Sequence, residues 1–385
     1  MANALSAQEQ EMWEAETQAL LEERSIFMDI ATMRDAVGKA IIHNPYNVRP
    51  QSETYTKYND VNIKPLIAVA DNMDTFTSRI VTFDYDPVDA LDTEYNTVAD
   101  AKEDCAYQLS MDMERAFFEE YSNAQFASSA AVTLDSSNTL LTFANAKATL
   151  TNNGADDRDM ITVVDDFVHA SIANYVTTNG YNEADGAIRR GYKWEFVGSR
   201  LYSSSSLIAE ASLTPAINFV ADTTVTINGV VFTAKATPAA AWEFDIGAST
   251  AASIDNLVAA INNANGYAAG EWLATTYFEV SAEDRDLLNG VVATDGTTTV
   301  DIETRGYRAL SSSIAKWGAV SLNTLVMQRG AIDFALRSPV KLDSQPIPKQ
   351  LGTRYLTWVN YGKKTFTQNK KRMYNVKIVA QAAEV

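Results

Sequence analysis

The sequence predicts an α+β protein with more than one domain, and three observations support this. The chain has 385 residues, which exceeds the usual size of a single domain. Helical and strand-like periodicities alternate along it without an internal repeat. Hydrophobic residues make up 46% of the chain, against only 17 glycines and 9 prolines, so a sizeable core is expected and low-complexity coil is excluded.

The charge of the chain is acidic and unevenly distributed. The net charge is −18, which excludes a general basic nucleic-acid binder, because affinity for DNA comes largely from cations that neutralise phosphates. Residues 306–385 carry 13 basic and 3 acidic side chains, whereas residues 1–305 carry 18 basic and 46 acidic ones. Such a chain is suited to contacting copies of itself, although a charge run is also often no more than a solvated face.

The N-terminal region does not resemble a secretion signal. Six glutamates precede Arg24, the first basic residue. No run of about 18 apolar residues occurs, so we expect no membrane partner. Cys105, the single cysteine, can form neither an internal disulfide nor a zinc site alone, which is compatible with folding in a reducing cytoplasm.

The first half of the chain predicts a helix, an extended segment and a second helix. Ser6 and Glu9 have capping-box spacing ahead of an acidic amphipathic helix, which packs on its own domain or lies as an arm on a neighbour. Residues 53–85 alternate like strands and are expected to form a protruding two-stranded loop. Apolar residues then recur every three or four positions from Val98 to Tyr121, which predicts a helix about 40 Å long. Cys105 lies on its apolar stripe, which favours a buried, unreactive thiol.

The remainder predicts mixed structure, with an insertion. Residues 140–197 read as helix, buried strand, helix and a strand pair around a glycine. Residues 213–305 form a self-contained α+β pattern with few basic residues, and Asn228-Gly229 predicts a type I′ hairpin turn within it. Two further strands, expected near residues 354–359 and 373–379, flank a basic stretch: Lys363, Lys364, Lys370, Lys371 and Arg372.

No pattern predicts catalysis, a metal or a cofactor. His43 and His169 stand in no metal-binding motif, and neither a serine-hydrolase elbow nor a dinucleotide fingerprint is present. Residues 156–159, Asp-Asp-Arg-Asp, lack the alternating ligands of a calcium loop and favour a solvated turn. A carboxylate pair acting on sugars cannot be recognised from spacing, so a carboxylate enzyme stays an alternative.

The basic stretch is the candidate binding site. Its aromatic neighbours would allow stacking on single-stranded nucleic acid. The acidity of the rest of the chain favours contact with acidic surfaces of another subunit instead. We therefore take the following residues as inter-subunit contact candidates: Lys363, Lys364, Lys370, Lys371 and Arg372.

The order of these elements resembles the major capsid proteins of tailed bacteriophages with the Hong Kong 97 fold. Residues 76–85 running into 97–121 are similar to the extension loop and spine helix of that family. Residues 144–165 resemble the opening of its axial domain, and residues 185–197 the glycine-bearing strand pair of the same domain.

The resemblance implies a domain organisation for nearly the whole chain. It implies an N-terminal arm (1–50), an extension loop (51–96), a peripheral domain with the spine helix (97–130), an axial domain in two parts (131–212 and 306–350) around an insertion domain (213–305), and C-terminal β strands of the peripheral domain (351–385).

The resemblance also implies a function. It implies a structural protein, not an enzyme and without cofactors, that self-assembles into hexamers and pentamers of an icosahedral head around double-stranded DNA. Implied partners are scaffolding and portal proteins, a possible decoration protein, and the packaged DNA, bound non-specifically. The implied location is the virion, after assembly in the host cytoplasm. Alternatives are an encapsulin-type compartment shell and a phage tail or sheath component.

One branch of the family crosslinks a loop lysine to an asparagine. Lys57 and Lys64 lie in the matching loop, and the tail contains Asn360, Asn369 and Asn375. No motif pairs any of these lysines with an asparagine, so no crosslinking residue is assigned.

Overall fold

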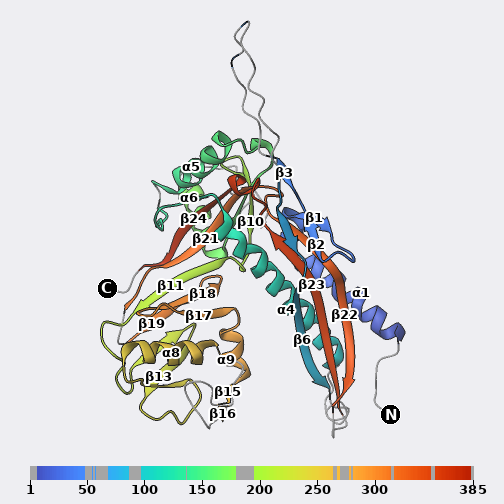
Figure 1. Cartoon of the computed structure of the whole chain (residues 1–385). Coiled ribbons are helices and arrows are strands. Elements are labelled where there is room, and N and C mark those ends of the chain that lie inside the picture. Colours follow the sequence, from blue (N-terminus) through green and yellow to red (C-terminus); the bar gives the residue numbers. More distant parts are fainter. Residues whose placement is uncertain are drawn as a thin grey trace. The chain divides into compact units, whose positions relative to one another are not determined.

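The computed structural model describes residues 7–47, 54, 57, 68–85, 97–135, 137–178, 195–262, 267–268, 277–278, 281–313, 316–347 and 352–382 (Figure 1). The chain divides into two compact units. The first comprises Met1–Gln125, Asn153–Ala155 and Gln328–Met373, and the second comprises Phe126–Asn152, Asp156–Met327 and Tyr374–Val385. No helix of the described residues is long and apolar enough to cross a bilayer.

The first unit is built on a four-stranded sheet. Its helices are α1 (Ala7–Arg24), α2 (Phe27–Ile30), α4 (Thr97–Phe118) and the 3-10 turns η1 (Glu119–Asn123) and η3 (Lys370–Arg372). Its strands are β1 (Thr32–Asp35), β2 (Ile41–His43), β3 (Tyr46–Asn47), β4 (Ala68–Val69), β5 (Asn72–Asp74), β6 (Thr77–Tyr85), β22 (Asp333–Pro346) and β23 (Thr353–Lys364). The main sheet has the order β1-β22-β23-β6, while β2-β5 and β3-β4 form separate pairs.

Strand β6 pairs with a distant part of the chain. All nine of its residues pair antiparallel with β23, from Thr77 opposite Tyr361 to Tyr85 opposite Thr353. The prediction that residues 53–85 form a two-stranded loop of their own is therefore wrong for β6. The physical reason is that β23 offers a buried aromatic face, where Phe83 and Tyr355 stack with ring centroids 5.2 Å apart.

The core of the first unit lies between this sheet and α4, which runs beside β6 and β23 (Figure 1). An aromatic row crosses it, because Phe334 lies 4.6 Å from Phe27 and 5.2 Å from Tyr361, measured between ring centroids. The predicted long helix is confirmed, but its α-helical part ends at Phe118. Cys105 is buried, and burial raises the pKa of its thiol, in agreement with the predicted unreactive role.

The second unit contains a ten-stranded and a four-stranded sheet. Its helices are α5 (Thr139–Asn152), α6 (Asp166–Thr178), α8 (Thr250–Asn262), α9 (Ala282–Leu287) and the 3-10 turn η2 (Asp157–Asp159). Its strands are β7 (Phe126–Ala127), β8 (Met160–Val164), β9 (Glu195–Phe196), β10 (Ser199–Ser203), β11 (Ile208–Thr214), β12 (Thr224–Ile227), β13 (Val230–Lys235), β14 (Glu243–Asp245), β15 (Tyr267–Ala268), β16 (Tyr277–Phe278), β17 (Val291–Asp295), β18 (Val300–Arg305), β19 (Leu310–Ser312), β20 (Lys316–Trp317), β21 (Val320–Gln328) and β24 (Met373–Gln381).

The ten-stranded sheet follows the path β17-β18-β11-β21-β8-β10-β9, with β20 paired to β11, and β24 paired to β21 and β7. Strand β8 is buried at every residue, as its mostly apolar sequence predicts. The two predicted tail strands join different sheets, since β23 lies in the sheet of the first unit and β24 in this one. The resemblance had placed both in one peripheral domain.

The predicted insertion contributes to both sheets of the second unit. The β12–β13 hairpin turns through Asn228 and Gly229 with φ angles of 50° and 92°, so the predicted turn with two positive φ angles is confirmed. Strand β14 and then β19 complete the small sheet, and Ile254, Leu257 and Ile261 of α8 are buried. Strand β18, however, pairs with β11 in the large sheet, and β17 pairs with β18 there.

Some predictions fall on residues that the structure does not describe. Lys64 and residues 185–194 of the predicted glycine-bearing strand pair lie outside the described residues.

Candidate subunit-contact surface

The structure divides the predicted basic stretch into two parts, and the first part is used within the subunit. Lys363 donates to the main-chain carbonyl of Ala116 and lies 2.6 Å from the carboxylate of Glu119. Lys364 lies 2.6 Å from the buried carboxylate of Asp71. Both ammonium groups therefore tie the end of β23 to neighbouring elements of the same unit.

The pKa of Asp71 reflects its contacts with Lys364 and with the turn after β23. Burial works to raise the pKa of Asp71, but hydrogen bonds from Lys364 and Thr367 outweigh it and hold the pKa below its ordinary value. The main-chain nitrogen of Thr367 donates to the second carboxylate oxygen at 2.7 Å. Lys364 is thus part of the folding of the turn that follows β23.

The second part of the cluster is the 3-10 turn η3. Lys370, Lys371 and Arg372 are partly exposed there, and Lys370 lies 3.4 Å from the side-chain oxygen of Asn123. Among the described residues, no carboxylate is within ion-pair distance of these three side chains. They are the members of the predicted set that keep their charge available to another molecule, and we call them the η3 basic turn.

The N-terminal helix is docked on its own unit. Trp13 is buried and stacks on Phe83 and Tyr355, with ring centroids 6.0 and 6.5 Å away. The described part of the predicted arm is therefore satisfied within the subunit. Of the two placements that the sequence left open, α1 takes packing on its own domain, because its apolar stripe of Trp13 and Leu21 packs against the sheet and α4.

Side chains of α1 also cap the exposed edge of β22. Glu14 accepts from the main-chain nitrogen of Leu342 at 3.1 Å and pairs with Lys341 at 2.7 Å, while Gln18 accepts from Val340 at 3.2 Å. Unpaired edge strands invite association with other chains, and these two side chains occupy donors that β1 does not reach. No sequence motif predicts that Glu14 and Gln18 bind the edge of β22, because these contacts depend on where β22 lies in the fold.

The outward side of α1 is acidic. Glu11, Glu16 and Glu22 are exposed, and Lys102 of α4 contacts Glu16. Together they offer negative charge at the surface of a unit whose η3 basic turn is positive. An acidic patch and a basic patch that do not touch each other within one subunit can still attract each other between two copies of the chain.

An ion pair with a buried carboxylate lies next to the η3 basic turn. Asp333 is fully buried, 2.7 Å from Nε of Arg34, and accepts from the side chain of Asn369 at 3.3 Å. Burial raises the pKa of Asp333 above its ordinary value of 3.8, although Arg34 and Asn369 act in the opposite direction. The charged carboxylate is therefore less favourable in the folded state than in the unfolded chain.

Asp333→Asn should consequently change how the free energy of unfolding depends on pH. Below the ordinary value of 3.8 the wild-type carboxyl is neutral in both states. As the pH rises through the higher folded-state pKa, the wild type loses stability relative to the variant. Denaturant unfolding of both proteins at several pH values tests this. A stability difference that stays constant, or that grows in favour of the wild type as pH rises, would contradict it.

The described loop lysine and the three tail asparagines are not brought together. Asn369 and Asn375 are buried and bonded to Asp333 and Asn323, respectively. Asn360 accepts a hydrogen bond from Ser78. Lys57 is exposed. Among the described residues, no hydrogen bond joins Lys57 to any of these three asparagines.

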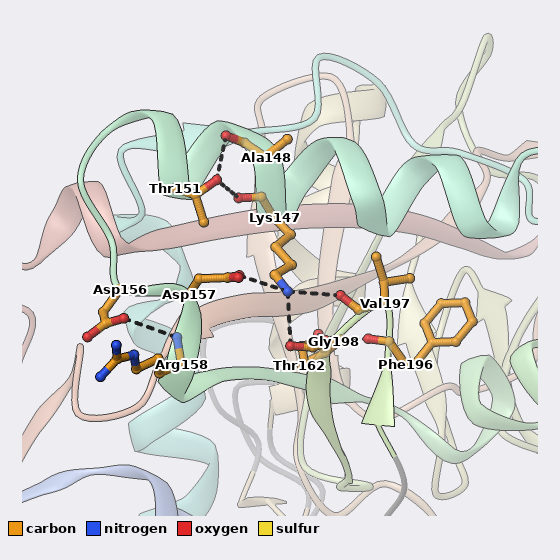
Figure 2. A network of polar contacts seen from close by, with 11 residues as sticks. Lys147, Ala148, Thr151, Asp156, Asp157, Arg158, Thr162, Phe196, Val197 and Gly198 are labelled. Carbon is orange, nitrogen blue, oxygen red and sulfur yellow. Dashed lines mark hydrogen bonds and ion pairs between the residues drawn. The ribbon is translucent and has the colours of Figure 1, made fainter.

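The acidic turn at residues 156–159 has a structural role. Asp156 caps η2 by accepting from the main-chain nitrogen of Arg158, and Asp157 lies 2.8 Å from Lys147 of α5 (Figure 2). Across the described residues no group of three or more histidine, cysteine or acidic side chains is arranged to hold a metal ion. His43 contacts Asn72 at 2.9 Å, in keeping with an ordinary surface residue.

Comparisons with known proteins identify the fold. No family model matches the chain, and no curated protein matches its sequence. A chain from Mycobacterium phage Che8 superposes with a TM-score of 0.51 at 10% identity, over 92% of this chain and 91% of the other. A chain of the cyanophage P-SCSP1u capsid gives 0.52 at 9%, over 92% and 88%. A chain of the mature capsid of bacteriophage PhiM1 gives 0.51 at 11%, over 92% and 87%. The chain therefore has the same fold as these phage chains, which agrees with the predicted Hong Kong 97-like fold class.

Proposed function

We propose that the protein is the major capsid protein of a tailed bacteriophage and forms the shell of its head. The observation that carries this proposal is the extent of the likeness, which covers 92% of this chain and at least 87% of each of three phage chains. A similarity confined to one sheet or one helix pair would support much less, because common motifs recur in unrelated proteins. In this protein the likeness includes residues of both units.

The proposal includes assembly into hexamers and pentamers that close into an icosahedral shell around double-stranded DNA. In this assembly the η3 basic turn contacts acidic surfaces of neighbouring subunits. Each exposed ion pair contributes only about 0.2–1 kcal/mol. Every subunit makes several, and a closed shell multiplies a small gain over many copies.

Electrostatics supports both the contacts and the cargo. Repulsion between acidic subunits is screened beyond about 8 Å at physiological salt, so short-range unlike pairs prevail. Acidic inner walls offer phosphates no fixed counter-charge, which would keep packaged DNA mobile and bound without sequence preference. The other proposed partners are scaffolding and portal proteins, and a decoration protein where the particle has one. The proposed site of assembly is the host cytoplasm, and the product is the virion.

Sedimentation of the protein produced with and without the other structural proteins of its particle tests this proposal. We expect particles of several megadaltons in the first case, far above the 42.2 kDa of one chain. A protein that stays monomeric beside its natural partners would refute the proposal. Release of sugars from polymers by the monomer would instead support a carboxylate enzyme. Particles that hold a cellular enzyme in place of DNA would support an encapsulin-type compartment.

A further inference from the structure

The turn between β9 and β10 has a strained backbone. Val197 has a φ of 55° and Gly198 a φ of 67°, so both central residues of this two-residue turn occupy the left-handed region. Glycine adopts such angles without steric cost, whereas a β-branched residue there is a true outlier. Backbone strain of this kind persists only where the surrounding structure imposes it.

The chain itself shows the relaxed alternative. In the β12–β13 hairpin the same two positions are held by Asn228 and Gly229, with φ angles of 50° and 92°. Asparagine tolerates the left-handed region far better than valine does. Turn geometry alone would therefore not select Val197, and the cause of its conformation must lie in its neighbours.

Lys147 of α5 is the neighbour that holds the turn (Figure 2). Its ammonium group donates to the carbonyl oxygen of Val197 at 3.1 Å and to that of Gly198 at 3.0 Å. The same nitrogen lies 2.8 Å from the carboxylate of Asp157. Charge-assisted hydrogen bonds are stronger than neutral ones, so a single side chain fixes both central peptide units.

The residues on either side of the turn are anchored separately. Phe196 is buried, and its ring centroid lies 5.6 Å from that of Phe143 on α5. The hydroxyl of Ser199 donates to the carbonyl of Phe196 at 2.7 Å and lies 2.8 Å from the hydroxyl of Thr162 on β8. Strand β9 has only two residue pairs with β10 and ends the order of its sheet. A minimal edge strand is thus joined to the sheet through a strained turn.

We propose that Lys147 is a latch on this strained hairpin. With its ammonium group in place, Val197 stays in the left-handed region and β9 stays paired with β10. Without it, Val197 relaxes and β9 leaves the sheet edge. The side chain of Lys147 is 17% exposed but that of Asp157 is 67% exposed, so a cationic group of another molecule can reach the carboxylate and weaken the latch. This inference does not depend on the proposed capsid function.

Amide hydrogen exchange of the full chain tests the latch. Lys147→Met should raise exchange across residues 195–200 by about tenfold, the equivalent of losing hydrogen bonds to a charged group. Val197→Asn should slow exchange there by about fivefold, the lower end of what a strained residue stores. We also expect Lys147→Met to have a smaller effect when position 197 is asparagine. Converted to a free energy of opening, its effect in the Val197→Asn background should be less than half of its effect in the wild type.

Two controls make the result specific to the turn. Exchange across β8 should stay unchanged in every variant, which excludes a general loosening of the second unit. Lys147→Arg keeps the charge and the donors, and should raise exchange less than Lys147→Met does. The proposal would be overturned if Lys147→Met raised exchange across residues 195–200 equally whether position 197 is valine or asparagine. If Lys147→Met does not fold, Val197→Asn alone decides, because unchanged or faster exchange in that variant would show that no strain is stored.

Discussion

Changing Lys370, Lys371 and Arg372 together to glutamate should leave a folded subunit that assembles poorly. The η3 basic turn has no ion pair with any described carboxylate of its own subunit, so charge reversal costs the fold little. In the proposed shell it would replace several attractive contacts between subunits by repulsive ones. We expect the assembled fraction to fall by at least about tenfold, since each lost pair is worth a few tenths of a kcal/mol and the losses add over the shell. Sedimentation and circular dichroism measure assembly and folding separately.

A matched control separates this interface from general charge effects. Arg158, Arg200 and Lys316 are exposed basic residues of the second unit, and changing them to glutamate alters the net charge equally. This control should assemble normally. Because Nε of Arg372 is buried, the Lys370→Glu, Lys371→Glu double variant serves if the triple variant is unstable. Normal empty shells that fail only to retain DNA would remove the interface interpretation and favour DNA binding by the η3 basic turn.

Trp13→Ala should strongly destabilise the unassembled subunit. The indole is 6% exposed and packs with Phe83, Tyr355 and Leu342. Deleting such a side chain from a packed core costs about 3–5 kcal/mol. It would also loosen α1, which holds Glu14 and Gln18 against the edge of β22. Denaturant unfolding at concentrations where the protein is monomeric gives the change in free energy of unfolding.

The neighbouring residue provides the control for this prediction. Met12 is 62% exposed, and Met12→Ala should change the free energy of unfolding by no more than about 0.5 kcal/mol. Equal, small effects at both positions would show that α1 is not docked on its own sheet in solution. It would then act as a free arm, as the sequence alone had allowed.

The parts of the fold that the sequence predicted are those with a local signal. The stripe that includes Cys105 and Leu109 reports a helix, the run Met160–Val164 reports a buried strand, and Asn228-Gly229 reports a turn, because each depends on neighbouring residues only. Strand pairing carries no such signal. Nothing in the sequence near Thr77–Tyr85 indicates that its partner strand lies at Thr353–Tyr361. Nor does the sequence indicate that the two tail strands belong to different sheets.

The sequence predicted which residues form the basic cluster, but not which of them make contacts within the subunit. The basic stretch was evident, yet the partners of Lys363 and Lys364 come from α4, η1 and the segment before β5, which only the folded chain brings together. The long strand β22 was not recognised, since bulges around Ser338 interrupt its alternation. Likewise, no pattern connects Lys147 with Val197, fifty positions away, because the contact depends on how α5 lies against the hairpin.

Electron microscopy of the sedimented protein distinguishes a shell from other assemblies. We expect closed shells with fivefold and sixfold arrangements of subunits, in which α4 of each subunit packs against the four-stranded sheet of its own unit. Open tubes would contradict it and identify a tail or sheath component. A field of separate subunits, from material produced beside its natural partners, would contradict shell formation altogether.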